Sequence, residues 1–235
     1  MKHLYVLLVF LIGILTPLHA KAYQTIWGQL LQRHVIQTQT KGITTTVVDY
    51  DQVGQSPSFI ALIRYMEQTE VPAPKDEAFA FWLDVYHMAL IKAFTVYPTM
   101  QNPDFYTTGL IRVAGIPMSL TEIQKQLNTF TETPLALVLT DGTLGSPDFP
   151  KNTSQGTAID VYCRQRVQEM LTNSSKGIKI EPNTQMIYAS QRVVDALGDN
   201  WIAHPEVKIA LQDINPQSYS IKILPYDKTP NRRYP

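Results

Sequence analysis

The sequence predicts an α+β fold: a helix-rich single domain with a small, mainly antiparallel sheet. One long segment, 76–97, is apolar on nearly all sides of a helix, which is typical of a central helix. Shorter segments with helical periodicity are interspersed with short stretches that favour strands. The chain contains no internal repeat and no clear linker, so one domain accounts for it.

Residues 1–22 have the three parts of a secretory signal. Lys2 provides a cationic start, an apolar stretch follows from about Leu4 to Leu15, and Ala20 and Ala22 are small residues suited to cleavage. A retained membrane anchor is the alternative, but roughly 15 apolar residues are short for the ~20 that a bilayer needs. The pattern therefore predicts a cleaved signal peptide and a periplasmic or secreted bacterial protein, with no integral membrane span after removal of the signal.

The expected organisation is a signal peptide at 1–22, one domain at 23–225 and a frayed C-terminal tail at 226–235. Lysine plus arginine and aspartate plus glutamate number 20 each, which gives no electrostatic case for binding nucleic acid or an anionic membrane. Cys163 is the only cysteine, so no intramolecular disulfide is possible. Its helical spacing from Val167 and Met170 predicts a buried thiol rather than a nucleophile.

The first part of the chain predicts helix, strand and helix in turn. An apolar stripe that includes Ile26 and Leu30 indicates a helix over about 24–37, and the threonine-rich stretch 44–50 favours a strand. Pro57 suits a helix start, and the apolar residues after it extend this helix to Met66.

Acidic residues begin the long helix at about 76–97, and Pro98 follows its end. A capping box at Ser119 to Glu122 predicts a helix to about Phe130, and the compact apolar run 135–139 predicts a buried strand. The loop 140–156 is long enough to suggest function or disorder. The remaining expected elements are a helix at 157–171, strands at 177–180 and 185–188, and helices at 190–196 and 205–211.

Metal and cofactor chemistry have little support. After the signal peptide the histidines are His34, His87 and His204, without the paired spacing of a zinc site, and no glycine-rich phosphate loop is present. The stretch that begins at Asp141 is similar to the start of the haloacid-dehalogenase phosphatase motif. That motif places its nucleophilic aspartate where this chain has Leu139, and an alkyl side chain cannot form an aspartyl-phosphate. We expect no metal and no cofactor.

Four residues are candidates for catalysis: Asp84, His87, Asp141 and Ser146. Asp84 and His87 lie three residues apart in the most apolar helix, so they share a face and either stabilise the fold or line a site. Ser146 lies in the long loop, but Gly-Ser-Pro is equally an ordinary turn, and a nucleophilic serine needs a base that only folding could supply. The candidates for binding are Asp84, Tyr86, His87 and Ser146.

Several segments together resemble the family named domain of unknown function 547. The likeness covers roughly 27–201, and its most specific part is the helix segment Glu77 to Leu90, with Tyr97-Pro98 behind it. The family motif usually reads Phe-Trp-Ile-Asn-Ala-Tyr-Asn-Ala-Leu, and this chain has Asp84 and His87 at its two asparagine positions.

The resemblance implies a loop with cysteines after the apolar run, and a fold comparable with that of thiol peptidases. Here Leu139 stands at the first cysteine position, and Ser146-Pro147 matches the Cys-Pro. The loss of both cysteines favours a non-catalytic, exported module that binds a peptide, glycan or protein of the cell envelope. The alternative is a divergent hydrolase of peptide or ester bonds, with Ser146, His87 and either Asp84 or Asp141 as its site.

Overall fold

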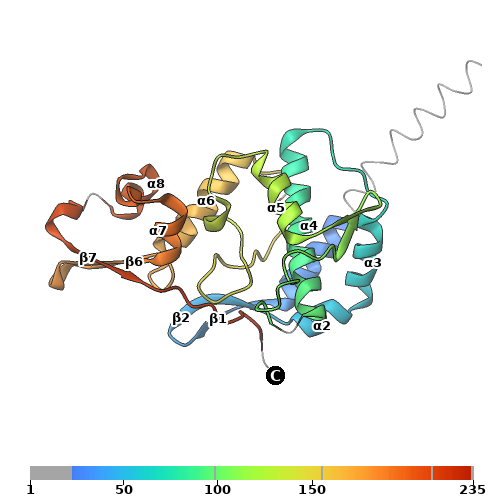
Figure 1. Ribbon diagram of the computed structural model, residues 1–235, viewed down its shortest axis with the longest axis horizontal. Helices are drawn as coiled ribbons and strands as arrows, with labels where there is room; N and C mark the ends of the chain where they lie inside the picture. The colour runs from blue at the N-terminus through green and yellow to red at the C-terminus, as the bar shows by residue number, and fades with distance from the viewer. Residues whose placement is uncertain (1–22, 98, 155, 213, 234–235) are drawn as a thin grey trace, which may run out of the picture.

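The computed structural model describes residues 23–97, 99–154, 156–212 and 214–233, and shows the expected helix-rich α+β domain with small sheets (Figure 1). The predicted signal peptide lies outside the described residues. Residues 23–34 form the first described helix. The α-helices that follow are α2 (Tyr50–Gln55), α3 (Pro57–Met66), α4 (Lys75–Val96), α5 (Leu120–Asn128), α6 (Ile159–Thr172), α7 (Gln191–Leu197) and α8 (Pro205–Ala210).

The strands form three small sheets within the described residues. β1 (Val35–Thr40) pairs antiparallel with β2 (Ile43–Val48), and β3 (Ile111–Val113) pairs antiparallel with β4 (Ile116–Met118). The third sheet has the order β5 (Ile178–Glu181), β6 (Met186–Ser190), β7 (Ser220–Leu224), in which β6 and β7 are parallel. Short 3-10 turns complete the elements: η1 (Leu135–Leu137), η2 (Pro182–Thr184), η3 (Trp201–Ala203) and η4 (Pro216–Ser218).

Helix α4 is the centre of the hydrophobic core. Its side chains are buried on all sides from Ala78 to Ile91, and α2, α5 and α6 pack against it. Among the described residues it is the one helix long and apolar enough to cross a membrane, but 83% of its most apolar window is buried inside the protein. That burial is what a core helix of a folded domain shows.

Two helix starts follow the expected capping chemistry. The Ser56 side chain accepts a hydrogen bond from the Phe59 amide, and Pro57 occupies the first turn of α3. At α5, the Ser119 hydroxyl accepts from the Glu122 amide while the Glu122 carboxylate accepts from the Ser119 amide at 2.7 Å. The capping box that the sequence predicts is therefore confirmed.

The predicted strand at 135–139 is wrong. Leu135–Leu137 form the 3-10 turn η1, and the Leu139 amide donates back to the Leu135 carbonyl at 2.8 Å. Two arginine side chains reach the neighbouring carbonyl oxygens: Arg192 donates to Ala136 at 2.8 Å and Arg166 to Val138 at 3.4 Å. Local turns and guanidinium groups thus satisfy backbone groups that a strand would satisfy with a ladder.

Both ends of the described chain differ from expectation. The first helix ends at residue 34, and the segment that was expected to continue it begins β1. At the other end, residues 226–233 are packed rather than frayed. The Asn231 amide donates to the Gly142 carbonyl at 2.8 Å, the Val48 amide donates to the Asn231 carbonyl at 2.9 Å, and Asn231 is buried. The C-terminal segment is therefore part of the fold and joins β2 to the long loop.

Candidate functional site

The loop 140–149 contains two of the candidate residues and is held against α4. The Tyr86 hydroxyl donates to the Thr140 carbonyl oxygen at 2.9 Å. Gly142 has a φ of +84°, and a Cβ at this position would overlap the ring of Phe94. Only glycine fits this backbone conformation and this close approach without strain.

Asp141 forms an ion pair with Arg192 of α7. Their Oδ2 and Nη1 atoms are 2.6 Å apart, and Asp141 Oδ1 accepts from the Thr143 amide at 3.0 Å and from its hydroxyl at 2.6 Å. Burial raises the pKa of Asp141, but Arg192 and the hydrogen bonds from Thr143 outweigh it and hold the pKa below its usual value. The Asp141 carboxylate is therefore ionised, and its ion pair with Arg192 joins the loop to α7.

Ser146 is fully buried, and its hydroxyl serves the loop itself. Its Oγ donates to the Thr143 carbonyl oxygen at 2.8 Å and lies 2.9 Å from the Thr140 hydroxyl oxygen. The Thr140 hydroxyl in turn accepts from the Gly142 amide at 3.1 Å. These contacts close the turn, and no base accepts a proton from Ser146 among the described residues.

A buried lysine holds the next part of the loop. Lys176 Nζ lies 2.5 Å from Asp148 Oδ1, and it also donates to the Ser146 carbonyl oxygen at 3.0 Å and to the Thr45 hydroxyl at 2.9 Å. Burial lowers the pKa of Lys176, and the Asp148 carboxylate opposes that shift. Arg166 of α6 also donates a hydrogen bond to the Asp148 carbonyl oxygen, which joins this part of the loop to α6.

Asp84 lies inside the core and contacts the first helix. Its Oδ1 accepts from the Trp27 indole nitrogen at 3.0 Å, and its Oδ2 accepts from the Tyr23 hydroxyl at 3.5 Å. Burial raises the pKa of Asp84 to about 7, and the two hydrogen bonds limit the rise. Asp84 thus joins α4 to the helix at 23–34.

His87 lies three residues further along α4, but no hydrogen bond joins its described side chain to Asp84. Its Nε2 is buried without a hydrogen-bond partner, and its ring packs against Phe149 with the centroids 4.9 Å apart. Burial and the charge of Arg166 lower the pKa of His87 to about 3, against a backbone hydrogen bond with Leu83. The imidazole is neutral at ordinary pH and packs against the rings of Phe149 and Tyr86.

The candidate residues therefore separate into two groups. Asp141 and Ser146 share the loop 140–149, whereas Asp84 and His87 lie within the core, and no hydrogen bond links Ser146 to His87 among the described residues. Tyr86 of α4 donates a hydrogen bond to the loop, and His87 of α4 packs against Phe149 of the same loop, although both side chains are buried.

The sequence does not single out Arg192 and Lys176, two of the cations that hold the loop. The available signal was weak: each cation belongs to a segment otherwise expected to contribute to the core, Arg192 in a predicted helix and Lys176 just before a predicted strand. Each lies 28 residues or more from its carboxylate partner. Sequence spacing alone does not predict a pairing over that separation.

The described residues contain no group of three or more histidine, cysteine, aspartate or glutamate side chains that could hold a metal ion. Cys163 is buried as predicted, and burial raises the pKa of its thiol. Comparison of the chain with protein-family models, with curated proteins and with solved structures finds no match. The fold and the contacts thus define a helix-rich α+β domain in which Asp84, His87 and Ser146 are buried, and in which Asp141 is partly buried and paired with Arg192.

Proposed function

We propose that this chain is an exported, non-catalytic binding module of the cell envelope, a divergent relative of the family named domain of unknown function 547. Its partner would be a peptide, a glycan or another protein. The export proposal rests on residues 1–22, and the family proposal rests on the motif around Trp82 and Tyr86.

The observation that carries the non-catalytic proposal is the state of Ser146. Its hydroxyl is fully buried and bonded to Thr140 and Thr143 of its own loop. A nucleophilic serine needs access to substrate and a base within about 3 Å. Asp141 is a poor base, because its pKa is held below the usual value, and its carboxylate contacts Arg192 and Thr143 rather than Ser146. These contacts favour a structural role for Ser146 over a role as a nucleophile.

The test is a hydrolysis screen with a panel of esters and short peptides. We expect the wild-type protein to show no turnover above the rate without protein, and Ser146→Ala to match it. Ser220→Ala is the matched control, because Ser220 is an exposed serine of β7 outside the loop. Turnover that Ser146→Ala abolishes and Ser220→Ala retains, with both variants folded by circular dichroism, would support the hydrolase instead.

The export proposal has its own test. The full chain with a C-terminal tag is expressed in a bacterium, the cells are fractionated, and the mass of the protein is measured. We expect the periplasmic fraction to contain a chain that has lost about the first 22 residues. Leu8→Arg places a charge in the apolar stretch and should leave the intact chain in the cytoplasm. An intact wild-type chain that stays in the membrane fraction would show a retained anchor.

A further inference from the structure

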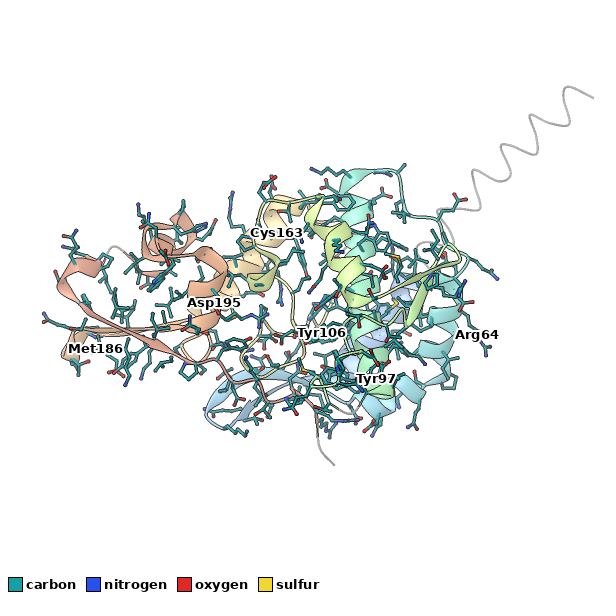
Figure 2. All side chains as sticks on the ribbon, in the orientation of Figure 1. Arg64, Tyr97, Tyr106, Cys163, Met186 and Asp195 are labelled. Atoms are coloured by element: carbon teal, nitrogen blue, oxygen red, sulfur yellow. The ribbon has the colours of Figure 1, made fainter. Side chains whose placement is uncertain are left out.

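A cavity of about 250 Å³ lies between α6, α8 and the segment that leads into η1. Its apolar lining includes Leu137 of η1, Val167 of α6 and Leu197 of α7. Figure 2 labels Cys163 on α6 and Asp195 on α7, two of the helices that border it. The volume equals the share of about eight water molecules in the liquid, so the cavity suits a small ligand rather than a large cofactor.

The polar lining of this cavity is acidic. Glu132, Asp160 and Glu206 contribute carboxylates, and Arg164 is the one cation among the lining residues. Arg164 Nε lies 3.7 Å from Glu206 Oε1, so that this charge is balanced. Within the part of the chain that the structure describes, Glu132 and Asp160 have no ion-pair partner, and both residues are exposed. The lining therefore combines apolar side chains with two carboxylates that have no ion-pair partner among the described residues.

The polar groups on the α8 side are already occupied. His204 Nδ1 accepts from the Glu206 amide at 3.3 Å, and the Glu206 carboxylate accepts from Gln168 Nε2 at 2.5 Å. These contacts hold the residues that α8 contributes to the lining. A ligand would find its free acceptors at the carboxylates of Glu132 and Asp160.

We propose that this cavity binds a linear aliphatic diamine. The methylene chain would cover the side chains of Leu137, Val167 and Leu197, and the two ammonium groups would balance the carboxylates of Glu132 and Asp160. A five-carbon diamine has about seven non-hydrogen atoms, which agrees with a space for about eight water molecules. This inference goes beyond the binding function proposed above, because a diamine is not a peptide, a glycan or a protein. Its failure leaves the hydrolysis and export results unchanged.

The experiment is isothermal titration calorimetry of the protein with 1,5-diaminopentane at pH 7 and low salt. We expect saturable binding, and Asp160→Asn and Glu132→Gln should each weaken it by roughly threefold to tenfold, as expected for partly exposed charge pairs. Glu70→Gln is the matched control, because it removes one exposed carboxylate outside the cavity and should leave the affinity unchanged. Higher salt should weaken the binding.

Pentylamine and a blocked lysine peptide separate the alternatives. Pentylamine has the same alkyl chain with one charge and should bind roughly tenfold more weakly than the diamine. Absence of heat up to 10 mM diamine would overturn the proposal. So would equal affinity for pentylamine, tighter binding of the lysine peptide, or a diamine affinity that neither Asp160→Asn nor Glu132→Gln changes. Glu132 lies outside the helices, so its variant remains informative if Asp160→Asn, in the first turn of α6, lowers stability.

Discussion

Asp84 and His87 impose opposite pH dependences on the stability of this fold. Burial raises the pKa of Asp84 to about 7, so between its ordinary value of 3.8 and that value the carboxyl group ionises only in the unfolded chain. Stability from Asp84 is therefore lost as the pH rises. Burial lowers the pKa of His87 to about 3, so between that value and its ordinary value of 6.5 the imidazole takes up a proton only in the unfolded chain. Stability from His87 is therefore lost as the pH falls.

The two contributions are equal in size where the ranges overlap. Each changes the free energy of unfolding by about 1.4 kcal/mol per pH unit, so that they cancel between about pH 4 and pH 6.5. Asp84→Asn leaves only the His87 contribution, and its free energy of unfolding relative to wild type should rise by about 3 kcal/mol across this range. His87→Asn should show a fall of about 3 kcal/mol, and the double variant should follow wild type.

The assay is urea unfolding at half-unit pH steps and constant ionic strength, monitored by tryptophan fluorescence. The difference between variant and wild type removes the contribution of the other titrating groups. Glu70→Gln, at an exposed carboxylate, is the control for the loss of one acid. A difference for Asp84→Asn that stays constant within about 0.5 kcal/mol from pH 4 to pH 6.5 would refute the reasoning, because such linkage requires a shifted pKa.

Three further predictions concern the long loop and its supports, each measured by urea unfolding at pH 7. Arg192→Met leaves the Asp141 carboxylate without its cation and should lower the free energy of unfolding by about 2 to 3 kcal/mol, less than for a fully buried pair; an unchanged value would show that solvent screens this pair. Gly142→Ala forces a Cβ into a core aromatic ring at positive φ and should cost about 2 kcal/mol or more, and a neutral effect would contradict the close approach. Tyr50→Phe removes the 2.5 Å hydrogen bond to Asn231 and should cost about 1 kcal/mol; if the C-terminal segment were frayed, the variant would match wild type.

The sequence predicts much of the helical part of the fold, because local chemistry determines it. Ser119 and Glu122 define the start of α5 within one turn. The segment that begins near Asp76 is apolar on nearly all sides, which predicts a helix buried in the core. The prediction of a strand at 135–139 is wrong because five apolar residues suit either a buried strand or a buried turn, and periodicity does not separate these two structures. The carbonyl groups of this segment accept hydrogen bonds from Arg192 and Arg166, which lie too far away in the sequence for a local pattern to include them.

The candidate site was less accessible to sequence reasoning than the fold. Ser146 and Asp141 were identified from their position in a long loop, but their partners are set by tertiary contacts. Thr140 closes the turn on Ser146, and Arg192 reaches Asp141 from 51 residues away. Whether a serine is a nucleophile or a structural hydroxyl depends on those contacts, which the spacing of residues does not encode.

Asp84 and His87 together preserve the neutrality of the core. Burial raises the pKa of Asp84 to about 7 and lowers the pKa of His87 to about 3. Between those values the folded protein keeps both side chains uncharged, as two amides would be. One group is an acid and the other a base, so their contributions to stability cancel between about pH 4 and pH 6.5, whereas either group alone would make stability depend steeply on pH. We therefore expect the double asparagine variant to be more stable than Asp84→Asn near pH 4, where His87 destabilises the fold most. It should also be more stable than His87→Asn near pH 6.5, where Asp84 destabilises the fold most.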